Sequence, residues 1–509
     1  MTRARPRTIP SLMSTAVSGF LNGRFVDAGP GDGALRAVSP SDLDDVIGEV
    51  PFARAHVDEA VRAARDIQPV WEALGVEARA HALQRFRDVI AKHEDEIART
   101  LAREVGKPLR EARAEAKAMV AKVDISLHEG LSLVADVDLD ARLGWRWRAH
   151  GVLSVLGPFN FPLHLPHGHV VPALLAGNAV VFKPSEVAPF TGSLYARMAA
   201  DAGFPPGVLN VVQGDAASGA ALAAHDDLDG VLFTGSYAVG AKILAANAHR
   251  PGLMIALELG GKNPGIVLDD APFEKAVTDV ALSAFSTAGQ RCTCVSRVIV
   301  TRGIAERFID ALAAHADALA VGHAMDPDVF MGPLATRAAR EKFEAMQRVA
   351  DEEGSACVRA PREPAVRWEC RAVRGHYVAP RVRRVTRPDP RSTYQREELF
   401  GPDLAVYVVD DLDQAIALAN DSPYGLAAGV WTTDASAFDR CAQRLRVGNL
   451  SWNAVTVGAS SRLPFGGVGN SGNHRPAGVF SSRYCAYPLA ITRGDPALDP
   501  RTIPPGVPR

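Results

Sequence analysis

Apolar residues recur every three to four positions between residues 56 and 122, among Ala, Arg and Glu. This spacing is typical of amphipathic helices that bury one face against a core. Gly106 and Pro108 interrupt the pattern, and a further helix is expected to begin near Leu109. The first part of the chain therefore predicts a layer of helices.

Strands are predicted where short apolar runs replace the helical spacing. Four such runs, separated by helical segments, lie at residues 151–157, 178–184, 207–214 and 230–236. A second series lies at residues 263–270, 296–303, 404–411 and 425–434. Because strands that alternate with helices usually form parallel sheets, we expect an α/β chain with two sheets and a seam near Gly260 and Gly261.

Two segments depart from this alternation. Trp145 and Trp147 alternate with Arg146 and Arg148, which predicts an exposed strand. Residues 351–385 carry scattered Arg, Pro and Cys without any period, so we expect a surface excursion there.

The composition narrows the class of protein. Of the 509 residues, 47% are hydrophobic and 22% are charged, which suits two or three globular domains and excludes a disordered chain or a coiled-coil rod. The 56 Lys and Arg residues nearly balance the 58 Asp and Glu residues, and the formal charge is −2. No overall field favours nucleic acid or an anionic membrane, and neither is expected as a partner.

The chain carries no clear targeting signal. No long apolar segment follows the arginines near its start, and the apolar stretch at residues 170–182 is too short to span a bilayer. The six cysteines are too few for a disulfide scaffold and fit a reducing compartment, so a cytoplasmic location is expected. A transit peptide, and a start at Met13 instead of Met1, remain open alternatives.

A cysteine in the run FSTAGQRCTCVSR is the first candidate for chemistry. Cys292 follows a Gly-Gln-Arg turn, where Arg291, backbone N–H groups or a bound positive ring could favour the reactive thiolate. The alternative is a small buried apolar residue, which is the commoner role of a cysteine. The neighbouring Cys294 is a second candidate, and position alone does not choose between the two.

Two further runs offer a base and an oxyanion donor. Glu258 ends an apolar run before Gly260 and Gly261, where partial desolvation would make its carboxylate a better base near neutral pH. A solvated or ion-paired strand-end glutamate is the alternative. Asn160, in GPFNFPLHLP, could donate its amide to a developing oxyanion, or could merely cap the following helix.

Residues suited to a nucleotide follow two other predicted strands. Lys183 and Glu186, in VVFKPSE, could contact a ribose or a phosphate. Gly235 and Ser236, in FTGS, precede a predicted helix whose first N–H groups could receive a pyrophosphate. No GxGxxG run follows any strand, so a dinucleotide site here would lack the usual Rossmann fingerprint.

Taken in order, these runs resemble the aldehyde dehydrogenase superfamily over about residues 20–489. The pair LELGGK and GQRC carries the resemblance, with PFNFP, KPSE, FTGS, EELFGP and PFGGVGNSG in support. It implies that Cys292 is the nucleophile, that Glu258 activates the water of deacylation, and that Asn160 completes an oxyanion hole with the Cys292 N–H. It also implies that NAD is held by Lys183, Glu186, Gly235, Ser236, Glu398 and Phe400.

The resemblance also implies an architecture. The fold would comprise two Rossmann-like parallel-sheet domains and an oligomerisation β-ribbon, in a homodimer or homotetramer. The segments would be an N-terminal extension at 1–18, an NAD-binding domain at 19–137 and 157–260, a catalytic domain at 261–477, ribbon segments at 138–156 and 478–495, and a tail at 496–509.

Within the superfamily, several runs resemble the subfamily that oxidises N-succinylglutamate semialdehyde with NAD in arginine catabolism. They are GQRCTC, GHVVPALLAGN, the serines before PFGG, and SGNHRP with YCAYPLA, whereas Leu163 and His167 depart from the pattern. A substrate with several carboxylates needs cations, and Arg291 and Arg462 are the candidates, although either could be solvated or structural. Another semialdehyde, or a broader range of aldehydes, remains the alternative substrate.

Other interpretations are weaker. An acylating enzyme that uses coenzyme A would not need Glu258, a cysteine hydrolase would need a histidine at Cys292, and a silent binding protein would not need the three catalytic residues together. His164, His167 and His169 suggest a metal, but Pro162 and Pro166 are expected to break their helical spacing, so no metal is predicted. Glu186 should repel a 2′-phosphate, which favours NAD over NADP.

Overall fold

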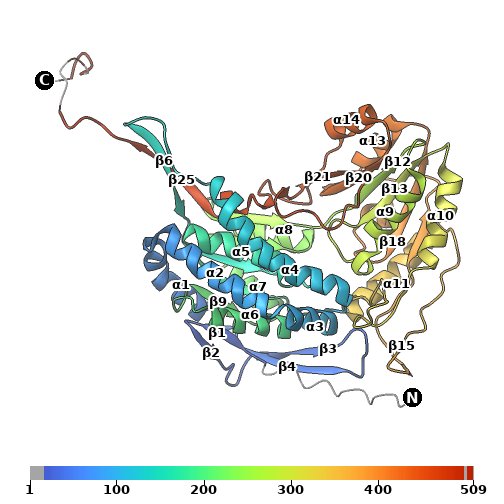
Figure 1. Cartoon of the computed structure of the whole chain (residues 1–509), viewed down its shortest axis with the longest axis horizontal. Coiled ribbons are helices and arrows are strands. Elements are labelled where there is room, and N and C mark those ends of the chain that lie inside the picture. Colours follow the sequence, from blue (N-terminus) through green and yellow to red (C-terminus); the bar gives the residue numbers. More distant parts are fainter. Residues whose placement is uncertain (1–15, 498–500, 502, 508–509) are drawn as a thin grey trace.

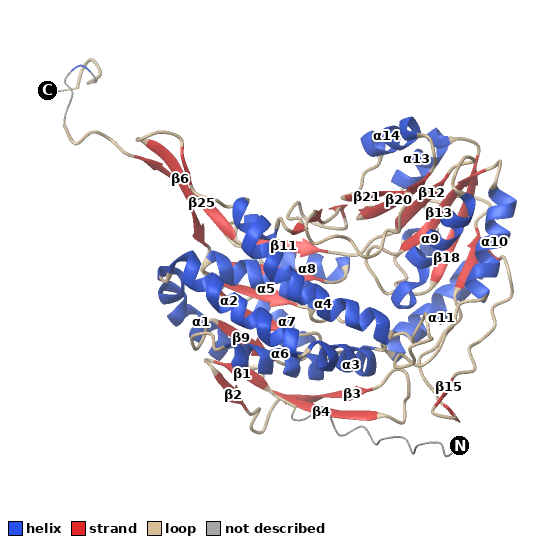
Figure 2. Cartoon of the chain, in the orientation of Figure 1, coloured by secondary structure: helices blue, strands red, loops and turns tan. Residues whose placement is uncertain are grey.

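The computed structural model of the protein describes residues 16–497, 501 and 503–507. Most of the predicted N-terminal extension, including the alternative start at Met13, lies outside the described residues. The described chain contains two seven-stranded sheets with helices packed around each (Figure 1; Figure 2). No helix in this part of the chain has the length and apolar character needed to cross a bilayer.

The first sheet contains all four strands of the first predicted series. Its order is β11 (Met254–Glu258), β10 (Gly230–Thr234), β7 (Val152–Leu156), β8 (Ala179–Lys183), β9 (Leu209–Val212), β1 (Gly19–Leu21) and β2 (Arg24–Val26). The five strands from β11 to β9 are parallel, and β1 and β2 join one edge antiparallel.

Helices cover both faces of this sheet because successive strand residues point to opposite sides. In β8, Val180 packs with α2 (Gly75–Lys92), α4 (Leu109–Ile125), α5 (His164–Ala176) and α6 (Pro189–Ala202), whereas Val181 packs with α1 (Ala55–Ala73), α7 (Ala216–Ala223) and α8 (Tyr237–Ala246). The predicted helical layer is confirmed, and α3 (Glu94–Val105) ends at Gly106 in the left-handed conformation, with φ 72°.

The second sheet contains the second predicted series. Its order is β14 (Ala356–Cys357), β17 (Arg381–Arg384), β18 (Asp403–Val409), β13 (Val295–Thr301), β12 (Asn263–Val267), β20 (Ala427–Trp431) and β21 (Asn449–Trp452). All pairings are parallel except that of β14. Gly260 and Gly261 lie between β11 and β12, and therefore between the two sheets.

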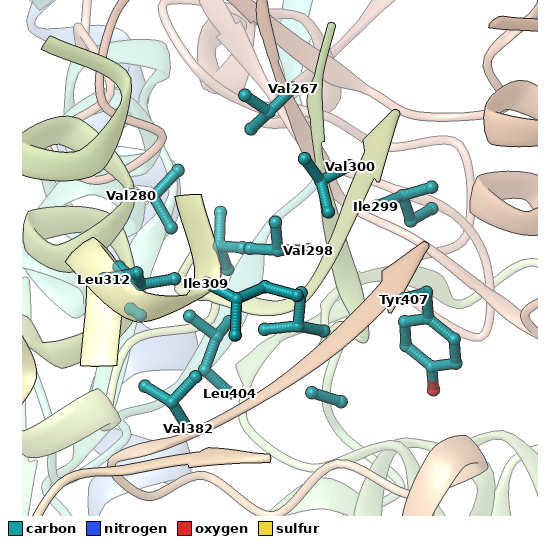
Figure 3. Packing of buried hydrophobic residues seen from close by; sticks show 14 of the residues in the cluster. Val267, Val280, Val298, Ile299, Val300, Ile309, Leu312, Val382, Leu404 and Tyr407 are labelled. Carbon is teal, nitrogen blue, oxygen red and sulfur yellow. The ribbon is translucent and has the colours of Figure 1, made fainter. Parts of the chain in front are cut away.

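The core of this half forms between the sheet and its helices. Figure 3 shows Val298 and Leu404 of adjacent strands meeting Ile309 and Leu312 of α10 (Ala305–Asp317). On the remaining flanks lie α9 (Phe273–Phe285), α11 (Arg337–Glu352), α13 (Leu412–Asn420) and α14 (Ala435–Arg444).

A ribbon projects from the first half of the molecule. It is formed by β5 (Val137–Asp138), β6 (Leu143–Ala149) and β25 (Ala486–Thr492), as Figure 1 shows near the C-terminal end. The predicted strand at Trp145 and Trp147 is confirmed as β6. The predicted ribbon segment 138–156 is too long, because β7 lies inside the first sheet, where both of its faces are buried.

Residues 351–385 are a surface excursion only in part, which corrects the prediction. β14 and β17 belong to the second sheet, and Arg383 of β17 is almost fully buried. The hairpin β15 (Arg367–Trp368) and β16 (Arg371–Ala372) lies outside it, and the following residues reach the first half of the molecule. Tyr377 Oη donates to the Ser41 carbonyl at 2.8 Å, so the excursion ties the two halves together.

We expect the core in Figure 3 to carry much of the stability of the second half. Leu404 has no exposed surface, so Leu404→Ala should lower the free energy of unfolding by about 2–5 kcal/mol, through lost burial and the remaining cavity. Val70→Ala on α1, where the valine is 57% exposed, is the control and should change it by less than about 0.5 kcal/mol. Urea denaturation followed by circular dichroism measures both, and equal midpoints would contradict this packing.

Candidate active site

A single cavity of about 1040 Å³ collects nearly every predicted functional residue. Its walls include Asn160, Lys183, Glu186, Gly235, Ser236, Glu258, Arg291, Cys292, Glu398 and Phe400. The reason is topological: β7, β8, β10 and β11 are parallel, so the residues that follow their carboxyl ends gather at one edge of the sheet. The loops before β13 and β18 of the second sheet supply the opposite wall.

The loop that carries Cys292 is held in an unusual backbone conformation. Thr287, Ala288 and Gly289 have φ values of 53°, 54° and 69°, in the left-handed region. A Cβ at Gly289 would lie 2.2 Å from the Gly401 carbonyl oxygen, so only glycine fits there. Non-glycine residues persist in this region only where their surroundings hold them.

Gln290 Nε2 donates to the Thr287 carbonyl at 3.1 Å, and Asn263 holds the residues that follow. Its Nδ2 donates to the carbonyl oxygens of Cys292 at 2.7 Å and Cys294 at 2.9 Å, and its Oδ1 accepts from the Ala427 N–H at 3.0 Å. Thr456 Oγ1 adds a hydrogen bond to the Thr293 carbonyl at 2.8 Å. Every peptide from Cys292 to Cys294 is therefore fixed by a side chain of the second half.

The two cysteines of this loop differ in access. Cys292 is partly exposed and lines the cavity, whereas Cys294 is buried, is not among the lining residues, and donates its Sγ to the Ser286 carbonyl at 3.8 Å. Burial, followed by the charges of Glu398 and Glu258, raises the pKa of Cys292 to about 12. The geometry therefore favours Cys292, and its sulfur rests as the thiol.

Glu258 ends β11 inside the same cavity. Its Oε1 accepts a long hydrogen bond from the Ala477 N–H at 3.3 Å, and its buried Oε2 has no hydrogen-bond partner among the described residues. Burial raises the pKa of Glu258 well above its ordinary value, although Lys122 acts in the opposite direction. The carboxyl group is neither solvated nor ion-paired, which excludes the structural alternative and suits a base that works near neutral pH.

Asn160 lies in the loop after β7 and is almost fully buried. Its Nδ2 donates to the Gln290 carbonyl at 2.9 Å, two residues before Cys292. The following helix α5 has Leu163 at its N-cap, without a side-chain cap, so Asn160 is not a capping residue. An amide held beside Cys292 in this way has a second hydrogen to offer to an oxyanion.

The other end of the cavity has the donors and acceptors that a dinucleotide needs. Lys183 Nζ and Glu186 Oε2 lie 3.5 Å apart, and Ser236 caps α8 by accepting from the Val239 N–H at 3.4 Å. The first turn of α8 therefore opens on the cavity with N–H groups suited to a pyrophosphate. A carboxylate, a lysine and a helix N-terminus form a set that fits a dinucleotide.

Glu398 approaches from the second half. Its Oε1 accepts from the Gly261 N–H at 2.8 Å, and a Cβ at Gly260 would lie 1.9 Å from its Oε2, so this glycine makes room for the carboxylate. Burial raises the pKa of Glu398 to about 7. Phe400 packs edge-on against Phe159, with 5.9 Å between ring centroids.

The two arginines predicted to bind substrate are both occupied. Arg291 Nη2 lies 2.6 Å from Glu111 Oε2, so its charge is already neutralised at the cavity wall. Arg462 is 69% exposed, pairs with Glu129 at 2.8 Å and is not among the lining residues, so the geometry does not support contact with a substrate inside the cavity. Sequence spacing could not reveal either carboxylate partner, because both lie far away along the chain.

The three histidines all lie on α5, which corrects the expectation that prolines would separate them. Pro166 lies in the first turn, where no backbone N–H is needed. His167 contacts the Tyr195 hydroxyl at 2.9 Å, and His169 contacts Thr234 Oγ1 at 3.2 Å and the Tyr484 hydroxyl at 2.7 Å. Within the described ranges, no group of three or more His, Cys, Asp or Glu side chains is arranged to hold a metal ion.

Sequence reasoning missed five charged residues of the cavity wall, which are Glu111, Glu115, Lys122, Lys242 and Lys342. Lys122 in the last turn of α4 is only 6% exposed and lines the cavity beside Glu258. Its Nζ donates to Ser461 Oγ at 3.0 Å. The sequence indicates the burial of Lys122 through its helical spacing from Ala112, Ala116 and Met119, which lie on the same buried face of α4.

The fold and this cavity define an α/β protein in which a partly exposed cysteine and a buried carboxyl group line one cavity. The chain belongs to the aldehyde dehydrogenase family, whose model matches residues 26–487. It is therefore an oxidoreductase that acts on aldehydes, and its predicted family and fold class are confirmed.

Similar proteins include two curated bacterial enzymes named N-succinylglutamate 5-semialdehyde dehydrogenase. The one from Chromobacterium violaceum is 41% identical over 496 residues, which are 96% of this chain and 99% of the relative. The one from Chromohalobacter salexigens is 42% identical over 493 residues, covering 96% and 98%. A crystal structure of an aldehyde dehydrogenase C mutant from Pseudomonas syringae, in complex with NAD and octanal, has a TM-score of 0.88 and 31% identity, covering 98% of this chain and 99% of that chain.

Alkylation by iodoacetamide should distinguish the two cysteines of the loop. Cys292 should react before Cys294 because it alone of the two lines the cavity. Since burial raises the pKa of Cys292 to about 12, its thiolate fraction should grow about tenfold per pH unit, and the rate should still be rising at pH 10. Peptide mass spectrometry measures both rates, with the exposed Cys370 as the reagent control. Faster labelling of Cys294, or a plateau below pH 9, would contradict the site.

Proposed function

We propose that this enzyme oxidises N-succinylglutamate 5-semialdehyde to N-succinylglutamate with NAD. The observation that carries the chemistry is that Cys292, Glu258 and Asn160, from separate strand ends and loops, line one cavity. The substrate is supported by the two relatives of that name, which match nearly the whole chain. NAD is supported by the bound cofactor of the similar crystal structure and by the donor set of the cavity.

Cys292 would begin the reaction by attacking the aldehyde carbon. Its proton must first pass to a water molecule, which can reach the partly exposed Cys292, because the pKa of about 12 keeps the resting sulfur protonated. The carbonyl oxygen becomes an oxyanion as the C–S bond forms, and the Asn160 amide and the Cys292 N–H would stabilise it. Each such donor is worth roughly 3–4 kcal/mol in a transition state.

The thiohemiacetal on Cys292 must then lose a hydride to become a thioester. When bound, NAD supplies the positively charged ring that accepts this hydride. Glu398, which accepts a hydrogen bond from the Gly261 N–H, would hold the ribose next to that ring. Lys183 and Glu186 would hold the ribose at the far end. Glu186 also disfavours a 2′-phosphate, so NADP is the poorer cofactor.

Glu258 would complete the cycle by hydrolysis. Its unpartnered Oε2 can take a proton from a water molecule that attacks the thioester carbon, and the Cys292 thiolate leaves. An acylating enzyme would pass the acyl group to coenzyme A and would have no use for this base. The buried carboxyl group thus favours a carboxylate product.

We also propose a homodimer or homotetramer that works in the cytoplasm. β25 of the ribbon carries Tyr487 and Leu489, which are 45% and 41% exposed, and a partner subunit would cover such apolar side chains. All six cysteines are unpaired, as suits a reducing compartment. The domain boundaries stated above remain predictions, apart from the ribbon segment already corrected.

Substitution of the two cysteines tests the proposed nucleophile. Cys292→Ala should abolish formation of NADH with N-succinylglutamate 5-semialdehyde, because no other thiol lines the cavity within the described residues. Cys294→Ala should keep most of the activity and is the matched control. Steady-state rates on a panel of semialdehydes, with this compound giving the highest kcat/KM, would support the substrate. Substantial turnover by Cys292→Ala would refute the mechanism.

Substitution of Glu258 should separate acylation from hydrolysis. In Glu258→Gln we expect one equivalent of NADH per site in a rapid burst, followed by turnover that is roughly 10²–10⁴-fold slower, because only deacylation needs the base. The wild-type rate should rise as pH increases through the raised pKa of Glu258, since the base acts when deprotonated. Stopped-flow absorbance across pH 5–9 measures both effects. A variant without a burst, or with a wild-type steady state, would show that Glu258 has another role.

A further inference from the structure

Lys122 occupies a place in the cavity that the catalytic cycle above does not use. It enters from α4, close to Ser461 of the second half, and it lines the cavity together with His164 and Glu258. Gly168 of α5 leaves it room, because a Cβ there would lie 2.7 Å from Lys122 Cε and 3.1 Å from Nζ. The helix pair α4 and α5 is therefore shaped around this side chain.

The charge of Lys122 has no carboxylate partner. In the part of the chain that the structure describes, it forms no ion pair, and Ser461 Oγ is its hydrogen-bond partner. A buried cation without a counter-ion is costly, and burial lowers the pKa of Lys122 to about 8. Lys107, an equally buried lysine at the start of the same helix, is instead paired with Glu115.

Two other cations set into the cavity wall, Arg291 and Lys183, already have carboxylate partners, whereas Lys242 and Lys342, which also line the cavity, are exposed to solvent. Arg291 pairs with Glu111 at 2.6 Å, and Lys183 lies 3.5 Å from Glu186. Beside Lys122, the buried Nδ1 of His164 has no hydrogen-bond partner among the described residues. A free cation and an unused ring nitrogen in one wall suit a polar, anionic ligand better than an aliphatic chain.

We propose that Lys122 binds a carboxylate of the aldehyde substrate and so selects carboxylated semialdehydes. This rests on the proposed function, in which the aldehyde occupies the Cys292 end of the cavity. The carboxylate would supply the missing counter-ion, accept a charge-assisted hydrogen bond from Nζ, and leave the Ser461 hydroxyl as a second donor. Lys122 is then a specificity residue, and it performs the role that sequence reasoning sought in Arg291 and Arg462.

A different role for Lys122 would leave a different signature. If the charge of Lys122 acted only on Glu258, whose pKa it lowers, then removal of Lys122 would slow the oxidation of every aldehyde by the same factor. If it served only the packing of α4 against α5, its removal would lower stability without any preference among substrates. The test therefore compares substrates that differ in a single carboxylate.

The experiment measures kcat/KM of wild type and Lys122→Met with N-succinylglutamate 5-semialdehyde, glutarate semialdehyde and pentanal. For the two carboxylated aldehydes we expect a loss of roughly 10- to 100-fold, mostly in KM, because a hydrogen bond to a charged group is removed. Pentanal, which matches glutarate semialdehyde without the carboxylate, should change by less than about threefold. Ser461→Ala removes the neutral second donor and keeps the charge, so its loss should fall on the same two carboxylated aldehydes and be far smaller than that of Lys122→Met.

Equal losses for all three aldehydes, or no loss for any, would overturn the proposal. If Lys122→Met does not fold, Gly168→Ala replaces it, because its methyl group must displace the lysine and should also penalise carboxylated aldehydes selectively. The effect of Lys122→Met on the ratio of kcat/KM for glutarate semialdehyde to kcat/KM for pentanal tests the role of Lys122, whatever the physiological substrate is. The proposed physiological substrate fails separately, if wild type oxidises N-succinylglutamate 5-semialdehyde no better than the other two.

Discussion

The short segment from Glu258 to Asn263 joins the two halves of the molecule and positions both reacting groups. Glu258 ends the last strand of the first sheet, and Asn263 begins a strand of the second. Glu258, the proposed base, is thus five residues away from the amide that fixes the carbonyl oxygens of Cys292 and Cys294. Between them, Lys262 donates to the Glu397 carbonyl at 2.7 Å, which ties the loop of Glu398 to the same segment. A displacement of this segment would separate base, nucleophile and cofactor ligand together.

Burial sets the resting state of this site. It raises the pKa values of Glu258, Cys292 and Glu398, which shifts each group toward its neutral form within the cavity between the two sheets. A neutral thiol beside a neutral carboxyl group avoids the repulsion between two buried negative charges. The same surroundings set Lys122 apart, since the buried Lys107 is paired with Glu115 and the buried Lys262 donates to two backbone carbonyls, whereas Lys122 donates to the neutral hydroxyl of Ser461. In the proposed complex, the counter-ion of Lys122 is therefore a carboxylate of the substrate.

Local patterns in the sequence predicted the elements and most of the cavity, because strand ends and their glycine-rich loops are encoded over a few residues. Prediction failed where the cause was distant in the chain. Arg291 and Arg462 were assigned to substrate because Glu111 and Glu129 could not be seen as their partners. The excursion at 351–385 looked irregular because its sheet strands are only two and four residues long. The spacing of apolar residues predicts the helix α4, but it does not by itself show that a charged residue, Lys122, lies on the buried face of that helix.

The central claim is that Cys292 carries the acyl group which Glu258 helps to release. Intact-protein and peptide mass spectrometry of Glu258→Gln, quenched in acid after mixing with NAD and N-succinylglutamate 5-semialdehyde, tests it most directly. The account predicts that the peptide containing Cys292 gains the mass of the N-succinylglutamyl acyl group, and that hydroxylamine removes this mass. An unmodified Cys292, or an acyl group on Cys294 instead, would contradict it.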